Sequence, residues 1–279
     1  MEQQRTETRS ITAEQQKRVE EICFHALALI GRNCEYLEQH FDRTGADEPA
    51  RQAVADISTA AMQLDRTLSG AMTLLDFLRE DTKPQLYPID LCELLQQVAA
   101  QSDMIRAQLG VDIRLDYGGC TACYVMADRR DAELLCLHLL SNALRASREG
   151  GSVCIALHRT ESGWQLTVTD DGCGLPGEDA QAALENRRSF LGGAQLGLLL
   201  CRECCRRMDW NLQLEPAPEK GTQAVVSIPL YAGETRPDGT VELRTDTETE
   251  QAQRKYHLRA MLVREMRTMP ERGDPEEDL

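Results

Sequence analysis

The feature that most constrains the fold is the spacing of apolar residues in the first eighty positions. They recur at steps of three and four over residues 10–43 and again over about residues 50–80, which predicts two long helices. The turn-forming residues 44–49 separate the two segments. Two long helices with a short connection predict an antiparallel hairpin, which buries its apolar seam poorly by itself. We therefore expect a dimeric four-helix bundle; packing of the hairpin on its own chain is the alternative.

The pattern changes after a linker at residues 82–84. Short alternating segments now predict strands, and longer periodic segments between them predict helices. Helices are expected at about 90–109, 130–147 and 196–208, with strands at 111–115, 124–127, 152–158, 164–169, 211–215 and 223–229. The expected fold class is α+β, in which the helical hairpin precedes a two-layer α/β sandwich with a mixed sheet.

Three divisions of the chain follow from these patterns. Residues 1–83 are expected to form the hairpin, residues 84–231 the sandwich and residues 232–279 an acidic tail. The tail contains a candidate short strand at 240–244 and a candidate amphipathic helix over 248–268.

Charge and cysteine content exclude several classes of partner. The chain has 31 Lys and Arg against 46 Asp and Glu, a formal net charge of −15, which argues against nucleic acid and against a polybasic membrane anchor. No apolar run approaches the roughly 20 residues that span a bilayer, and the polar N-terminus lacks a secretory signal. Eleven cysteines without an export signal indicate free thiols in a reducing compartment. We expect a cytoplasmic protein with no membrane span.

Two cysteine groups are candidate zinc or redox sites. Cys120 and Cys123 form a C-x-x-C pair, and Cys201, Cys204 and Cys205 follow on a predicted helix. Nothing in the pattern requires the two groups to meet, so unremarkable thiols are the preferred interpretation.

Three short motifs stand in a fixed order in the predicted sandwich. The first is LLSNALR (residues 139–145) on a helix, and the second is VTDDGCGL (residues 168–175), where a strand ends in a glycine turn. The third is GGAQLGL (residues 192–198), which leads into a helix, and Gly221 and Thr222 begin a later strand. Each motif alone is a weak signal, but their order on these elements indicates a nucleotide site.

The residue types suit an adenine nucleotide. A carboxylate at a strand end, Asp170, can accept a hydrogen bond from the exocyclic amine of adenine, whereas guanine would leave it unpaired. Gly172 and Gly174 would let the backbone approach the ring without a Cβ. Gly193 and Gly197, before and at the start of a helix, would present backbone N–H groups to phosphate.

The motif on the helix suits a metal and the phosphates. The amide oxygen of Asn142 is a hard ligand for Mg²⁺, and Arg145 lies one turn further on, where it could reach phosphate. A strongly acidic chain repels a bare triphosphate, so Mg²⁺ and these local donors must overcome that field.

Over roughly residues 12–231 the chain resembles the catalytic core of a sensor histidine kinase. The resemblance is carried by MTLLDFL (residues 72–78), YPIDL (residues 87–91), Ala127 with Asp128, and the three nucleotide motifs. Its ATPase domain resembles the superfamily shared with gyrase, a heat-shock chaperone and mismatch-repair ATPases. The resemblance implies a dimerising bundle that carries a phosphoacceptor histidine, and a domain that binds Mg-ATP under a lid at residues 176–190.

The family reaction passes the γ-phosphate to that histidine and then to an aspartate of a response regulator. By the same resemblance, Leu196, Leu198 and Thr222 join the nucleotide-binding residues. No receiver domain is visible, so a response regulator would be a separate protein.

The chain departs from the family pattern at the phosphoacceptor. His25 occupies the expected place in the first helix, but Ala26 follows where the family has an acid, and Ile30 replaces a proline. His40 is the second candidate.

Two further departures lie in the nucleotide motifs. Four residues before Asn142 the family usually has a polar residue, often Asn, and this chain has His138, which could act as a base, face the metal, or be a hydrogen-bonded helix histidine. Gln195 replaces the middle glycine of the third motif.

Three functions remain open at this point. The first is a working kinase phosphorylated on His25. The second is a pseudokinase or scaffold, in which bound ATP sets a conformation that a partner protein recognises. The third is a kinase that phosphorylates serine on a partner, similar to anti-sigma factors, against which the long dimerisation hairpin argues.

Overall fold

A computed structural model of the chain describes residues 13–45, 47–79, 83–147, 149–174, 196–233, 241–243 and 247–267. The chain divides into two compact units, Met1–Met72 and Thr73–Leu279. The expected boundaries at residues 83 and 231 stay predictions. Among the described residues, no helix combines the length and the apolar character needed to cross a bilayer.

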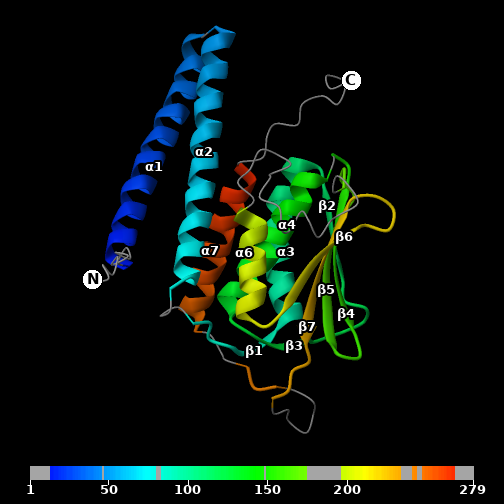
Figure 1. Ribbon diagram of the computed structural model, residues 1–279. Helices are drawn as coiled ribbons and strands as arrows, with labels where there is room; N and C mark the ends of the chain where they lie inside the picture. The colour runs from blue at the N-terminus through cyan, green and yellow to red at the C-terminus, as the bar shows by residue number, and fades with distance from the viewer. Residues whose placement is uncertain are drawn as a thin grey trace, which may run out of the picture. The chain divides into compact units, whose positions relative to one another are not determined.

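The first unit contains most of the predicted helical hairpin, whose second helix continues past Met72 into the second unit. Helix α1 (Ala13–Thr44) runs beside α2 (Glu48–Phe77), as Figure 1 shows. At the turn, Arg51 pairs with Asp42 at 2.9 Å, and at the other end the side-chain amide of Gln16 donates to the Met72 carbonyl at 3.4 Å. These two contacts show that α1 and α2 are antiparallel. This is the helical hairpin that the apolar spacing predicted.

Much of the apolar stripe on the hairpin is exposed in the single chain. Cys34, Val54 and Ala61 are buried. Large apolar side chains on both helices are nevertheless more than half exposed: Ile22 (62%), Ile57 (52%) and Leu64 (60%). An apolar surface of this kind on two neighbouring helices is typical of a bundle interface.

The second unit contains the mixed sheet that the sequence predicted. Its five strands lie in the order β2 (Asp112–Asp116), β4 (Ser152–Arg159), β5 (Gly163–Asp170), β7 (Thr222–Pro229), β6 (Asn211–Pro216). β2 and β4 are parallel and the other pairs are antiparallel. A separate antiparallel pair joins β1 (Tyr87–Asp90) to β3 (Tyr124–Ala127). β1 was not predicted, because four residues including Pro88 give too little alternation to read.

Helices α3 (Leu91–Leu109), α4 (Arg129–Ala146) and α6 (Leu196–Arg207) lie on one face of this sheet (Figure 1). Helix α7 (Glu248–Arg267) packs against α3 and α4. The core lies between helices and sheet, and α4 is buried along most of its length, with Leu135, Leu137 and Leu140 fully enclosed. The α+β fold with a two-layer sandwich is therefore confirmed.

Helix α7 is part of the second unit rather than a loose tail. Thr247 caps it: the Glu250 N–H donates to Thr247 Oγ1 at 3.3 Å, and Glu250 Oε2 accepts from the Thr247 N–H at 2.8 Å. Leu258 and Leu262 are buried in the same core as α3 and α4. The helix expected over 248–268 is thus present. The described part of the expected strand, residues 241–243, forms no strand.

We expect Leu262→Ala to lower the free energy of unfolding of the second unit by about 2–5 kcal/mol, because a fully buried leucine leaves a cavity. Chemical denaturation followed by circular dichroism measures the change. Tyr256→Ala on the same helix is the control, since this side chain is 77% exposed and its loss should change stability by less than about 0.5 kcal/mol. Equal effects of the two substitutions would show that α7 does not pack as described.

Candidate nucleotide-binding site

Asp170 ends strand β5 and is held by the backbone of two other segments. Its Oδ1 accepts hydrogen bonds from the N–H of Gly172 at 3.0 Å and of Thr222, the first residue of β7, at 3.2 Å. The side chain is buried. Among the described residues, no hydrogen-bond donor reaches its other oxygen, Oδ2. One carboxylate oxygen therefore belongs to the fold, and the second remains available to a ligand.

Burial raises the pKa of Asp170 above its usual range, and the two backbone hydrogen bonds act in the opposite direction. The neighbouring Asp171 carboxylate raises the pKa further. Asp171 Oδ2 accepts from the Ser152 N–H at 2.8 Å, which ties the end of β5 to the start of β4. Sequence reasoning treated Asp171 only as part of the motif and missed this role.

The glycines around Asp170 are required by the packing of the chain on itself. A Cβ on Gly172 would overlap the carbonyl oxygen of Ala146, the last residue of α4, and a Cβ on Gly221 would overlap the backbone of Asp170. Gly174 (φ +78°) and Gly221 (φ +103°) also have backbone conformations that favour glycine. The interpretation that Gly172 is glycine in order to admit a flat ring is therefore incomplete, because the carbonyl of Ala146 already occupies that space.

His138 and Asn142 project from α4 toward the start of α6. A Cβ on Gly197 would lie 3.5 Å from Asn142 Oδ1 and 3.7 Å from His138 Nδ1. His138 is buried and Asn142 is half-buried. The Asn142 Nδ2 atom is buried, with no hydrogen-bond partner among the described residues. The structure thus places the described end of the third motif beside the first motif.

The remaining predicted site residues are placed as follows. Thr222 contacts Asp170 as described, and Arg145 is half-buried on α4 one turn beyond Asn142. Leu196 and Leu198 are half-buried in the first turn of α6, and Leu198 packs against the core. Gly193, Gln195 and the expected lid at residues 176–190 lie outside the described residues.

The two candidate phosphoacceptors belong to the first unit. His25 and His40 are both exposed on α1, and the His40 ring stacks on Tyr36 with centroids 6.3 Å apart. The role of either histidine as phosphoacceptor stays a prediction.

The cysteines form no metal site among the described residues. All eleven are free thiols, and no group of three metal-ligating side chains occurs in the described ranges. Burial, as the largest cause, raises the pKa of Cys92 and of Cys205 to about 12, which makes these thiols poor nucleophiles.

A cavity of about 350 Å³ lies away from these motifs, beside β1, the start of α4 and α7. Several of its charged groups already have partners: Arg129 pairs with Glu133 at 3.1 Å, Asp128 caps α4 and Glu250 caps α7. The cavity shares no residue with the predicted nucleotide site.

The fold and the ordered motifs resemble those of an ATPase domain of the histidine kinase type. Residues 127–232 match the family described as "Histidine kinase-, DNA gyrase B-, and HSP90-like ATPase". The matched segment begins at the end of β3 and ends just after β7, so it contains all three motifs.

Curated relatives extend the similarity beyond this domain. The chain is 25% identical over 186 residues to the adaptive-response sensory kinase SasA of Synechococcus sp. (strain CC9902), covering 64% of this chain and 48% of the relative. It is 29% identical over 197 residues to the alginate biosynthesis sensor protein KinB of Pseudomonas aeruginosa, covering 67% of this chain and 33% of the relative. The chain therefore spans less than half the length of either relative.

Solved structures share the fold. Full-length ShkA, crystallised in complex with AMPPNP, matches with a TM-score of 0.59 at 19% identity over 80% of this chain and 47% of its own. The Acinetobacter baumannii histidine kinase AdeS matches with a TM-score of 0.51 at 20% identity over 74% of this chain and 96% of its own. Together the matches support the resemblance to a sensor histidine kinase catalytic core that the sequence motifs indicated.

We expect Gly172→Ala to destabilise the second unit by about 1–3 kcal/mol, because a methyl group must displace the Ala146 carbonyl at the end of α4. Thermal or denaturant unfolding measures the loss. Cys173→Ala is the control, since this neighbouring residue in the same turn is exposed. A stability of Gly172→Ala equal to that of Cys173→Ala would contradict the described packing of the turn.

Proposed function

We propose that this protein binds Mg-ATP in the second unit and signals in a two-component system by phosphoryl transfer to His25. The observation that carries the nucleotide part is the divided use of Asp170. Two backbone N–H groups hold Oδ1, so the carboxylate is fixed in direction, and Oδ2 can accept a hydrogen bond from the adenine amine. ShkA, which has the same fold, was crystallised with an ATP analogue, and this supports the assignment.

In this proposal, α4 and the start of α6 form the part of the site that binds the phosphates and the metal. Asn142 offers an amide whose donor is buried without a partner among the described residues, and its oxygen suits Mg²⁺. The backbone at Gly197 begins α6 beside it, and the first-turn N–H groups of a helix favour phosphate. Bound Mg²⁺ would neutralise phosphate charge. We propose that His138 contacts the bound Mg²⁺ and that Arg145 contacts the phosphates.

His25 is the proposed acceptor in the first unit. Its exposure on α1 leaves the ring accessible, and imidazole nitrogen is a competent nucleophile when neutral. Ala26 supplies no carboxylate to take the proton, so transfer should be slower than in relatives with an acid there, by about 10²–10⁴-fold. A rate near zero would leave the pseudokinase function, in which ATP binding alone is the signal.

The partners follow from the same proposal. The exposed apolar stripe on α1 and α2 supports a homodimer through a four-helix bundle. The relatives are sensory kinases, which supports a separate response regulator as the recipient of the phosphoryl group. Free thiols throughout support a cytoplasmic location.

We expect Asp170→Asn to weaken binding of Mg-ATP by at least about 100-fold, because the amide cannot satisfy the backbone donors and the adenine amine in the same way. Titration calorimetry measures the affinity for Mg-ATP, and a parallel titration with GTP tests whether the site discriminates adenine from guanine. Asp209→Asn is the matched control: Asp209 is exposed with φ 57°, a conformation that Asn tolerates. Undiminished ATP affinity in Asp170→Asn would overturn the site.

The test of phosphoryl transfer uses Mg²⁺ and γ-labelled ATP. We expect acid-labile label on the wild type, none on His25→Gln, and full label on His40→Gln and on His158→Gln, which removes another exposed histidine. Label that persists in His25→Gln and vanishes in His40→Gln would move the acceptor to His40. Binding without label would favour the pseudokinase, and acid-stable label on an added partner would favour the serine kinase.

A further inference from the structure

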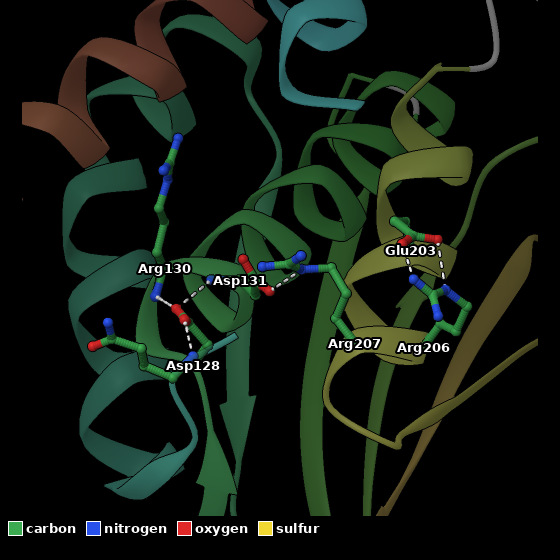
Figure 2. Close-up of polar contacts among 7 residues, drawn as sticks. Asp128, Arg130, Asp131, Glu203, Arg206 and Arg207 are labelled. Carbon is green, nitrogen blue, oxygen red and sulfur yellow. Dashed lines mark hydrogen bonds and ion pairs between the residues drawn. The ribbon is translucent and has the colours of Figure 1, made fainter. Parts of the chain in front are cut away.

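A buried ion pair joins α4 to α6 at the end of these helices opposite the nucleotide motifs. Arg207 Nε lies 2.6 Å from Asp131 Oδ2, and the two side chains are 8% and 2% exposed (Figure 2). Burial raises the pKa of Asp131, and the hydrogen bond from Arg207 opposes that effect. Breaking such a pair leaves one buried charge uncompensated, so the two helices are held firmly at this point.

The same guanidinium contacts the last turn of α2. The Arg207 Cζ lies 4.3 Å from the centroid of the Phe77 ring, within the range of a cation–π interaction. Phe77 is 8% exposed and belongs to the core cluster of the second unit, and Leu74, one turn earlier, packs against that cluster. Arg207 is therefore shared between α4, through Asp131, and the end of α2, through Phe77.

The contacts between α4 and α6 keep one antiparallel register along both helices. Gly197 faces Asn142, Cys201 Sγ lies 4.0 Å from the Leu135 carbonyl oxygen, and Arg207 pairs with Asp131. The intervals match: positions 131–142 on α4 and 197–207 on α6 span about 16.5 and about 15 Å at ~1.5 Å per residue. Because the Asp131–Arg207 ion pair holds the two helices together at one end, a change in their spacing at the other end would strain this pair.

We infer that Arg207 is a positioning residue that couples occupancy of the nucleotide site to the last turn of α2. The inference rests on the proposed nucleotide binding at Asn142 and Gly197. Phosphate bound at the first turn of α6 and at Asn142 would hold these two helix ends against each other. Because the helices are rigid over this length, the geometry of the Asp131–Arg207 pair at the far end is then fixed as well, and with it the position of the guanidinium over the Phe77 ring.

The alternative is that Arg207 only braces the fold. A brace would change stability when removed, but it would not make the last turn of α2 respond to nucleotide. The readout that separates the two roles is hydrogen exchange of the Leu78 and Arg79 amides, which donate to the carbonyls of Leu74 and Asp76 at 3.1 and 3.2 Å. Coupling between sites means that exchange at these amides depends on bound ligand.

The experiment uses the full chain with a non-hydrolysable ATP analogue and Mg²⁺. In the wild type we expect the analogue to slow exchange at these two amides by about fivefold or more. Phe77→Leu should bind the analogue within about twofold of the wild type but lose the slowing, because it keeps apolar bulk without a ring face. Phe77→Tyr keeps the ring face and should restore the slowing.

Arg206 supplies the matched control on the same helix. It turns away from the ion pair and bonds Glu203 one turn earlier at 2.9 Å, as Figure 2 shows. Arg206→Gln should behave as the wild type in both affinity and exchange. The double variant Asp131→Asn with Arg207→Gln removes both charges together, so it should fold and bind the analogue without the slowing.

Each outcome decides the matter. Slowing that persists in Phe77→Leu, or in the double variant, would overturn the coupling, as would wild-type binding with no change at Leu78 and Arg79. If the wild type fails to bind the analogue at all, the proposed function is overturned and the coupling with it. Loss of slowing in Arg206→Gln would show a general effect of charge on α6, and would also overturn a specific role for Arg207.

Discussion

Helix α4 is the constraint on which the second unit depends. It is apolar on almost every side, so it must be enclosed, and the sheet, α3, α6 and α7 enclose it. Its polar residues at positions 131, 138, 142 and 145 are spaced by seven, four and three, which places them on one stripe of the helix. A helix buried in this way can carry polar side chains only where a protein group or a ligand can form hydrogen bonds or ion pairs with them. The stripe therefore marks both the contact with α6 and the proposed nucleotide site.

Asp170 shows how one carboxylate can serve the fold and a ligand together. Its Oδ1 closes the turn that follows β5 and joins it to the start of β7, and the surrounding glycines let the backbone segments approach that closely. The direction of Oδ2 is consequently set before any ligand arrives, which reduces the entropy lost on binding. The structural role of this residue is compatible with the proposed recognition of adenine, and the same Asp-x-Gly-x-Gly motif would serve both.

Local sequence patterns predicted most of the architecture and none of its long-range polar contacts. Most helices and strands could be predicted because the apolar spacing that indicates each of them is visible within its own short segment of sequence. The Asp131–Arg207 pair joins residues 76 positions apart, so no local sequence pattern could predict it. The signal that could have found Asp131 is its place seven residues before His138 on the same helical stripe. The reason for glycine at 172 was also out of reach, since the Ala146 carbonyl that requires it comes from another motif.

The contribution of α7 to the core has a consequence for synthesis of the chain. The hairpin is built from contacts between neighbouring segments, so it can form as soon as residue 77 has left the ribosome. The core of the second unit is complete only when Leu258 and Leu262 have emerged, some thirty residues beyond the segment that matches the ATPase family. Until then the faces of α3 and α4 that α7 covers expose apolar surface, and a chain interrupted at the family boundary would keep that surface exposed.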